Sequence, residues 1–315
     1  MSSTIGVDVG GTKIAAGVVA EDGSVVEKVR RDTPADDVTA VAGTIVELVR
    51  ELREHHQVES VGVGAAGWIS ADRATVLFAP NLSWRDEPLR DRVEEEVGIP
   101  VIVENDANAA AWGEFRFGAG ADCDDMLFVT VGTGVGGGVV VDGELMRGTF
   151  GVAAEIGHFR VVPGGHLCGC GRLGCFEQYA SGTALVRAAR ERVEADPQSA
   201  PLMRAAHGDI DRIDGPMITE LARANDPFCV DLLGDLGTWL GEGIASLAAV
   251  LDPGLVAIGG GVAEAGDLLM QRTRKAFLAT LPGVDHRPHL VMRLATLGNE
   301  AGLIGAADLS RAERR

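Results

Sequence analysis

The strongest constraint on the fold is an ordered set of strands and glycine turns that occurs twice. In the first half the order is strand, glycine turn, strand, Asp-Gly turn and strand, over Thr4–Val9, Gly10-Gly11-Thr12, Lys13–Val19, Asp22-Gly23 and Ser24–Arg30. The second half repeats this order over Leu127–Val131, Gly132-Thr133-Gly134, Gly136–Val141, Asp142-Gly143 and Glu144–Arg147. A pattern that recurs within one chain indicates an internal duplication, so we expect two similar α/β domains.

Elements outside the repeated pattern complete each α/β domain. Val38–Glu54 has helical spacing of apolar residues, and the strands Val61–Val63 and Val256–Ile258 each run into glycines. A chain of 315 residues is long enough for about two domains. We expect a smaller domain of residues 1–115 with the helical tail 299–315 packed back on it, and a larger domain of residues 116–298. Ligands of α/β sheets bind beyond the carboxyl ends of strands, so we expect the site in a cleft between the domains.

The composition limits the classes of partner. The formal net charge of −18 repels nucleic acids and anionic membranes, so neither is an expected partner. The first residues lack the basic region of a signal peptide, and no apolar run reaches the ~18 residues of a membrane span. We therefore expect a cytoplasmic protein, in which clustered cysteines hold a metal rather than form disulfides.

The two glycine turns are candidate phosphate sites. The segment 132–137 fits the dinucleotide pattern G-x-G-x-x-G, but a strand follows it where that pattern requires a helix, so we reject this interpretation. Tight turns can instead offer backbone N–H groups and the Thr12 and Thr133 hydroxyls to phosphate, and Asp8 could hold Mg²⁺ through water. The alternative is two ordinary hairpins with glycine at positive φ. The candidate nucleotide-binding residues are Asp8, Gly10, Gly11, Thr12, Lys13, Gly132, Thr133, Gly134, Gly136, Gly137 and Gly260.

A pair of polar residues, Asn105 and Asp106, follows the predicted strand Val101–Val103. A carboxylate at a strand end can orient and deprotonate a hydroxyl group. Because a hydroxyl group is a poor nucleophile, phosphotransferases use such a carboxylate to take its proton. The alternative is capping of the helix that begins near Ala107, but capping needs only one of the two residues. The pair therefore favours Asp106 as a catalytic base.

Four residues in a short stretch suit a tetrahedral metal ion. Cys168, Cys170 and Cys175 lie close together with glycines between them, and His158 precedes them. Three thiolates and one imidazole are typical ligands of Zn²⁺, and four protein ligands indicate a structural rather than a catalytic ion. The alternative is a set of free thiols with an unrelated histidine.

The two turns, with Lys13 and the glycines that follow Gly134, resemble the two phosphate loops of the ROK family of sugar kinases and repressors. The pattern of His158 and the three cysteines matches the H…CxCGxxGC pattern of that family. The resemblance covers about Thr4–Leu309 and implies the duplicated actin-like ATPase (ribonuclease H-like) fold with Mg-ATP as cofactor.

The resemblance also implies the sugar contacts. In this family the residues that match Asn105 and Asp106 bind the sugar, and the aspartate is the base. The residues that match Glu155, His158 and Glu177 hold ring hydroxyls. His158 can serve both zinc and sugar only if each ring nitrogen faces one of them. Two further candidate sugar contacts are Gly67 and Asn81.

Within the family, the resemblance is greatest to actinobacterial-type glucokinases, which implies ATP-dependent phosphorylation of glucose at its 6-hydroxyl. Kinases of fructose, mannose, N-acetylglucosamine or N-acetylmannosamine are alternatives of the same class. Polyphosphate as donor is disfavoured, since relatives that use it typically lack the cysteine cluster.

A sugar-responsive repressor is an alternative of another class. Such repressors carry an N-terminal DNA-binding domain, which we do not expect before Asp8, and the acidic charge suits DNA badly. Asp106 and the two turns argue against a sugar-binding regulator without catalysis. We also expect a homo-oligomer, a dimer or a tetramer.

Overall fold

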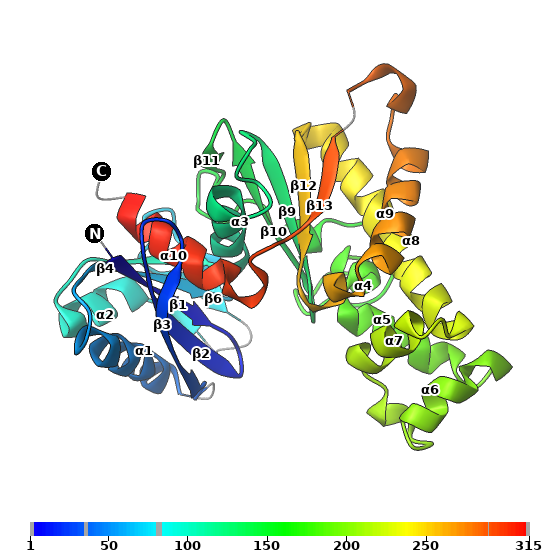
Figure 1. The fold of residues 1–315 in the computed structure, drawn as a ribbon, viewed down its shortest axis with the longest axis horizontal. Coiled ribbons are helices and arrows are strands. Elements are labelled where there is room, and N and C mark those ends of the chain that lie inside the picture. The colour runs from blue at the N-terminus through cyan, green and yellow to red at the C-terminus, as the bar shows by residue number, and fades with distance from the viewer. Residues whose placement is uncertain (1–2, 35–36, 80–83, 289, 313–315) are drawn as a thin grey trace. The chain divides into compact units, whose positions relative to one another are not determined.

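The computed structural model describes residues 3–34, 37–79, 84–288 and 290–312 (Figure 1). By its contacts the chain forms two compact units, which are considered separately below. The first unit comprises Met1–Phe128, Gly137–Ala154 and Ala295–Arg315, and the second comprises Val129–Gly136 and Glu155–Leu294. Residues 116–128 and 137–154 thus group with the N-terminal residues rather than with residues 155–294.

Two five-stranded sheets share one strand order, which is the structural form of the predicted duplication. The first is ordered β3-β2-β1-β4-β8 and the second β11-β10-β9-β12-β13. The first sheet contains β1 (Ser3–Val9), β2 (Lys13–Val19), β3 (Val25–Asp32), β4 (Val58–Ala65) and β8 (Val101–Asn105). The second contains β9 (Met126–Val131), β10 (Val135–Val141), β11 (Glu144–Leu145), β12 (Leu255–Gly259) and β13 (Val291–Leu294).

The outer strand pairs of the two sheets also match in direction. In the first sheet β1, β2 and β3 pair antiparallel, and β4 and β8 extend it in parallel. In the second, β10 pairs antiparallel with β11, and β12 pairs in parallel with β13. The strand predicted over Glu144–Arg147 ends earlier, at Leu145, where its pairing with β10 stops. The Arg147 side chain instead donates to the carbonyl groups of Ser70 and Ala71.

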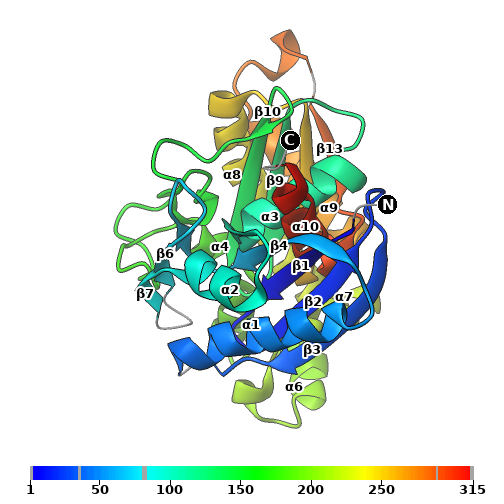
Figure 2. The same ribbon diagram turned by 90° about the vertical axis from the view of Figure 1, so that its left-hand side faces the viewer.

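Helices cover both faces of the first sheet (Figure 2). One face carries α1 (Val38–Arg53) and α2 (Leu89–Val97), and the other carries α3 (Asp106–Phe117) and α10 (Ala301–Ala312). A Cβ atom on Gly6 would lie 1.9 Å from the carbonyl oxygen of Leu303, and one on Gly62 would lie 1.8 Å from that of Ala306. Because these glycines lack side chains, α10 packs directly on β1 and β4.

A small three-stranded sheet belongs to the same unit. It contains β5 (Trp68–Ile69), β6 (Val76–Ala79) and β7 (Trp84–Glu87), in the order β5-β6-β7. Trp84 and Ile69 are fully buried in one apolar core with β1, β4, β8, α1 and α2. This core fixes the segment that carries Gly67.

The second unit is largely helical around β12 and β13. Its helices are α4 (Glu177–Ala180), α5 (Gly182–Arg192), α6 (Ala200–Ala205), α7 (Gly215–Arg223), α8 (Pro227–Leu251) and α9 (Asp267–Thr280). Short 3₁₀ turns are η1 (Ile156–His158), η2 (Pro197–Ser199), η3 (Ile210–Arg212), η4 (Gly261–Ala265) and η5 (Val284–His286), and η6 (Gly298–Glu300) lies in the first unit. The long helices α8 and α9 pack closely because a Cβ atom on Gly241 would lie 2.3 Å from the carbonyl oxygen of Thr273.

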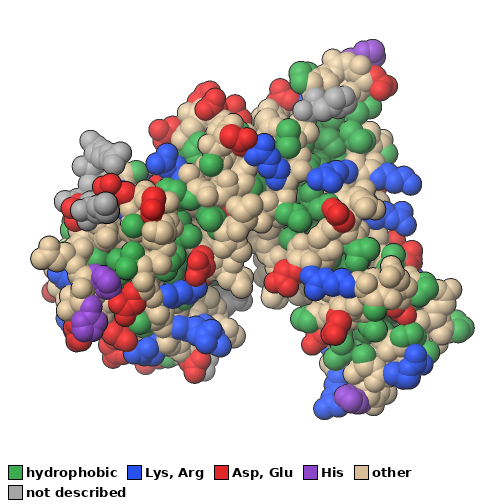
Figure 3. Space-filling view, viewed as in Figure 1, with side chains coloured by type: hydrophobic (Ala, Val, Ile, Leu, Met, Phe, Trp, Pro, Cys, Tyr) green, Lys and Arg blue, Asp and Glu red, His purple; other side chains and the backbone are tan. Residues whose placement is uncertain are grey.

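Two observations concern possible partners: the distribution of charged side chains on one face, and the length and apolar character of the helices. On the face seen in Figure 3, acidic and basic side chains are interspersed with apolar ones. Among the helices that the structure describes, none combines the length and the apolar character that a membrane span requires.

Candidate active site

The first glycine turn joins β1 to β2. The amide of Gly10 donates to the carbonyl of Lys13 at 3.0 Å, and the amide of Thr33 donates to that of Thr12 at 2.9 Å. Gly11 has no atom within 4 Å of where a Cβ would lie, and its φ is outside the left-handed region. The fold itself therefore does not require glycine at this position, whereas a bound ligand close to the backbone would require it.

The second turn joins β9 to β10 in the same topological position. The amide of Gly132 donates to the carbonyl of Gly134 at 3.0 Å. The start of α5 holds this turn, since Gly182 donates its amide to Gly132 at 2.8 Å and Thr183 donates its hydroxyl to Thr133 at 2.7 Å. Gly132, like Gly11, has open space at its Cβ position.

The alternative of ordinary hairpin glycines fails for both turns. The described glycines with positive φ do not include Gly10, Gly11, Gly132 or Gly134. Gly11 and Gly132 are therefore not needed for the conformation of the backbone. A side chain at either position would instead occupy space that is open to a ligand.

A cavity of about 1260 Å³ opens beside the second turn, within the second unit. Its walls come from Gly132 and Thr133, from α5 and α7, and from η4. The volume exceeds the roughly 300–1,000 Å³ that is typical of small-molecule sites, so the cavity has room for a nucleoside. The sequence motifs identified the turn but not the walls, because α5 and α7 carry no motif and lie 50 or more residues further along the chain.

Not every predicted nucleotide residue lies in this cavity. Gly136 and Gly137 are part of β10, and Gly260 packs with its φ of 86° against Val131, where a Cβ would lie 2.5 Å from the carbonyl oxygen. The neighbouring Gly261 lines the cavity instead. A Cβ on Gly134 would lie 2.1 Å from Oε2 of Glu177, so this glycine makes room for a side chain of the protein.

The Asn105–Asp106 pair lies where β8 ends and α3 begins. Asn105 is the N-cap, because its Oδ1 accepts a hydrogen bond from the amide of Asn108 at 2.9 Å. Its Nδ2 donates to the carbonyl of Gly67 at 3.0 Å, which places these two predicted sugar contacts together. Capping therefore accounts for Asn105 and leaves the role of Asp106 to be explained.

The protein environment raises the proton affinity of two carboxylates in the first unit. Burial raises the pKa of Asp106, although hydrogen bonds from backbone amides, chiefly that of Ala107, oppose the rise. Burial and the charge of Asp106 raise the pKa of Asp8 to about 6, against the opposing effect of Lys28. A carboxylate with a raised pKa is a better base near neutral pH.

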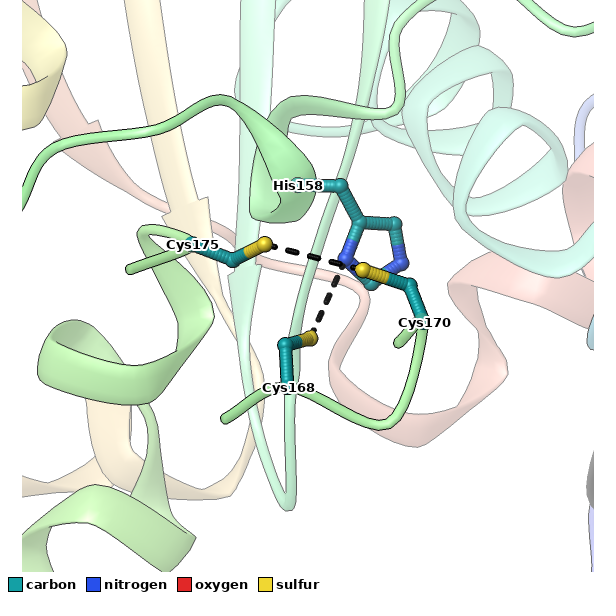
Figure 4. A group of neighbouring side chains, drawn as sticks. All are labelled: His158, Cys168, Cys170 and Cys175. Carbon is teal, nitrogen blue, oxygen red and sulfur yellow. Dashed lines mark hydrogen bonds between the residues drawn. The ribbon is translucent and has the colours of Figure 1, made fainter. Parts of the chain in front are cut away.

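The predicted metal ligands come together in the second unit (Figure 4). Nδ1 of His158 lies 3.6 Å from Sγ of Cys168, and Sγ of Cys170 lies 3.6 Å from Sγ of Cys175. All four ligand atoms lie within 4.8 Å of one another. Sulfur atoms bound tetrahedrally to Zn²⁺ at about 2.3 Å are about 3.8 Å apart, so the cluster fits such an ion.

The backbone around the cluster is fixed by a glycine. Gly174 has a φ of 78°, and a Cβ on it would lie 1.6 Å from the carbonyl oxygen of Val162.

Burial raises the pKa of the Cys168 thiol, and raises that of the Cys175 thiol to about 12. A bound cation is what converts such thiols to thiolates.

Three predicted sugar contacts adjoin this cluster. The other ring nitrogen of His158, Nε2, lies 3.9 Å from Oε2 of Glu155, so the two nitrogens face different groups, as a double role requires. Glu177 begins α4, and its Oε1 lies 3.6 Å from Sγ of Cys168. Its Oε2 accepts a hydrogen bond from the amide of Val135 at 3.2 Å. The remaining predicted contact, Asn81, lies outside the described residues.

Comparison with known proteins completes the description. A model of the ROK family matches residues 4–313. The chain belongs to the ROK family. It is 49% identical over 312 residues to a glucokinase of Streptomyces coelicolor, covering 99% of this chain and 98% of that protein.

Solved structures agree with this assignment. A ROK family glucokinase from Streptomyces griseus, in complex with glucose and AMPPNP, is 52% identical with a TM-score of 0.90 and covers 99% of this chain and 100% of that one. A ROK hexokinase from Thermus thermophilus is 36% identical with a TM-score of 0.83 and covers 99% of both chains. The predicted family and the predicted actin-like α/β fold are confirmed. A cytoplasmic location and a homo-oligomeric state remain predictions.

Proposed function

We propose that the protein is an ATP-dependent glucokinase, which transfers the γ-phosphoryl group of ATP to the 6-hydroxyl of glucose. Similarity over the full length to glucokinases, one of them in complex with glucose and AMPPNP, supports the reaction and its substrates. The structural observation that carries the proposal is Asp106, a carboxylate of raised pKa at the junction of β8 and α3. Its neighbour Asn105 already caps the helix, so Asp106 is available for chemistry.

In the proposed mechanism Asp106 takes the proton of the 6-hydroxyl as the sugar oxygen attacks the γ-phosphorus. The bond between the γ-phosphorus and the bridging oxygen breaks, and ADP leaves. Burial raises the pKa of Asp106, and this brings its basicity closer to what proton transfer near neutral pH needs. Asn105, held through Gly67 and Asn108, orients the sugar. Asp8 is the residue proposed to hold Mg²⁺ through water, and an ion bound there with ATP would neutralise charge at the phosphates.

The nucleotide is proposed to bind in the second unit. The 1260 Å³ cavity would take the nucleoside, and the turn at Gly132 and Thr133 on its wall would take the phosphates. The open Cβ position of Gly132 supports this assignment. In the first unit Gly11 and Lys13 are proposed to contact the phosphates from the matching turn.

Glu155, His158 and Glu177 are proposed to hold ring hydroxyls of the sugar, and the neighbouring cluster is proposed to hold a structural Zn²⁺. The spacing of the four ligand atoms fits Zn²⁺, and four protein ligands leave no open position for a catalytic water. The ion would fix the loop that carries these side chains, because metal binding is coupled to local folding.

A coupled assay of ADP release tests the substrate assignment. It compares glucose with fructose, mannose, N-acetylglucosamine and N-acetylmannosamine, and compares ATP with GTP and polyphosphate. The largest kcat/KM is expected for glucose with ATP. A larger kcat/KM for another hexose would replace glucose by that sugar and leave the kinase class unchanged.

Asp106→Asn tests the proposed base. We expect kcat to fall by roughly 10²–10⁴-fold, while the glucose-dependent rise in melting temperature is retained. Asp124→Asn, at an exposed loop residue of the same unit, is the control and is expected to keep wild-type turnover. More than about a tenth of wild-type kcat in Asp106→Asn would exclude Asp106 as the base.

A further inference from the structure

Glu104, the residue before Asn105, is a fully buried carboxylate held between two arginines. Its Oε2 lies 3.0 Å from Nε of Arg73 and 2.7 Å from Nε of Arg147. The side chain of Glu104 is 0% exposed, and those of the two arginines are 12% and 13% exposed. Burying three charges is costly unless each is paired, so this cluster is maintained against a large desolvation penalty.

The other oxygen of Glu104 holds the start of α3. Oε1 accepts a hydrogen bond from the amide of Asn105 at 2.9 Å and one from Nδ2 of Asn108 at 3.3 Å. Asn108 is buried and lies in the first turn of the helix. Glu104 therefore fixes both the peptide that carries Asn105 and the first turn of the helix that begins with Asp106.

The two arginines tie this junction to distant parts of the chain. Arg147 donates to the carbonyl of Ala71 at 2.6 Å and to that of Ser70 at 3.0 Å. Arg73 follows in the same turn, and its carbonyl accepts the amide of Val103 in β8 at 2.9 Å. The cluster thus joins the turn after β5, the end of β8 and the segment after β11 through a single carboxylate.

We propose that Glu104 is a positioning residue for phosphoryl transfer, which sets the orientation of Asn105 and Asp106 through its two oxygens. This proposal rests on the proposed function, because it assumes that Asp106 is the base and Asn105 a sugar contact. Because its side chain is fully buried, Glu104 is proposed to act through Asn105 and Asp106 rather than by direct contact with a ligand. It acts by preventing the peptide between β8 and α3 from rotating. Such a rotation would displace the base, and a displacement of about 1 Å can lower the rate of phosphoryl transfer about 100-fold.

Replacing Glu104 by glutamine tests the proposal. The glutamine keeps the size of the side chain but removes the negative charge that Glu104 presents to Arg73 and Arg147. A carboxamide cannot accept hydrogen bonds at both ends, so it cannot hold the two arginines and the helix start together. We expect kcat with saturating glucose and ATP to fall about 100-fold in the folded variant. We expect the KM for ATP to stay at the wild-type value, since the partners described for Glu104 are Arg73, Arg147, Asn105 and Asn108, which belong to neither glycine turn.

A matched control separates positioning from stability alone. Asp308 is also a buried carboxylate between two arginines, 3.2 Å from Nε of Arg116 and 2.7 Å from a guanidinium nitrogen of Arg311. It also accepts Nε1 of Trp112 at 2.9 Å, toward the far end of α3 from Asp106. Asp308→Asn is expected to lower the melting temperature comparably and to keep kcat within about twofold of wild type.

The outcomes decide the proposal. If Glu104→Gln and Asp308→Asn both melt earlier but both keep wild-type kcat, Glu104 is merely structural and the proposal is wrong. If Glu104→Gln lacks a cooperative melting transition, Glu104→Asp carries the test, because it retains the charge between Arg73 and Arg147 but shortens the reach to Asn105. Wild-type kcat in Glu104→Asp overturns the proposal. Absence of glucose phosphorylation by the wild-type protein would instead refute the proposed function itself.

Discussion

Replacing Asp8 by asparagine is expected to stabilise the folded protein at neutral pH while removing its activity. Burial, with the charge of Asp106, raises the pKa of Asp8 from 3.8 to about 6. The folded protein therefore keeps this carboxylate ionised at pH 7 at a cost that the unfolded chain does not have. At about 1.36 kcal/mol for each pH unit, the difference between 3.8 and about 6 corresponds to about 3 kcal/mol.

The sign of the effect follows from proton binding. Below pH 3.8 both states hold the proton, and the protonated Asp8 contributes its full share of stability. Between pH 3.8 and about 6 the folded state binds more protons than the unfolded state, so the free energy of unfolding falls as the pH rises. Above about pH 6 that contribution is lost. Asparagine cannot ionise, so Asp8→Asn removes this dependence and also removes the repulsion between Asp8 and Asp106.

Urea denaturation at a series of pH values from 4 to 8 measures the effect. The free energy of unfolding of Asp8→Asn minus that of wild type is expected to rise from near zero at pH 4 to about 3 kcal/mol above pH 7. Asp124→Asn, at an exposed position, is the control and is expected to give a flat difference. A flat difference for Asp8→Asn as well, or a variant less stable than wild type at pH 7, would refute the reasoning.

Two further predictions concern the second unit. A Cβ on residue 134 would lie 2.1 Å from Oε2 of Glu177, so Gly134→Ala displaces that carboxylate. We expect this variant to raise the KM for glucose about tenfold. Gly43→Ala is the control, because no atom lies within 4 Å of its added Cβ, and it is expected to leave the KM unchanged. Metal analysis of the wild-type protein is expected to find about one zinc ion per chain. Cys170→Ala is expected to lose that ion, to melt earlier, to raise the KM for glucose and to show a smaller glucose-dependent rise in melting temperature. Normal stability and sugar binding with a selective loss of turnover would indicate a catalytic zinc instead.

Local signals in the sequence predicted much of the fold. Alternating apolar strands with glycine turns predicted β1, β2, β9 and β10 to within one residue at each end. The helical spacing predicted over Val38–Glu54 corresponds to α1, which ends at Arg53. The cysteine spacing predicted a cluster that the structure assembles with His158. Each of these features depends on residues close together in the chain, which is why it could be read from the sequence.

Features that depend on distant residues were not predictable in the same way. The cavity walls on α5 and α7 reach the second turn only through the folded arrangement of the second unit. Arg147 reaches Glu104 and the turn at Ser70 across more than forty residues, and nothing in the local sequence marks this arginine. The contact between Gly134 and Glu177 likewise reassigns a glycine that the motif had placed against phosphate alone.

The shared strand order explains which site features the two halves have in common and which they do not. In both sheets a glycine turn joins the first two strands of the repeat, so each repeat carries one candidate phosphate turn. The repeats differ in the connection after the third strand. Between β3 and β4 the described part of this connection, residues 33–34 and 37–57, contains one helix, α1. Between β11 and β12 the connection contains the metal cluster and the helices α5 and α7, which line the cavity. The proposed base follows a different rule, because it depends on the junction of β8 and α3, where Glu104 and its two arginines hold the chain.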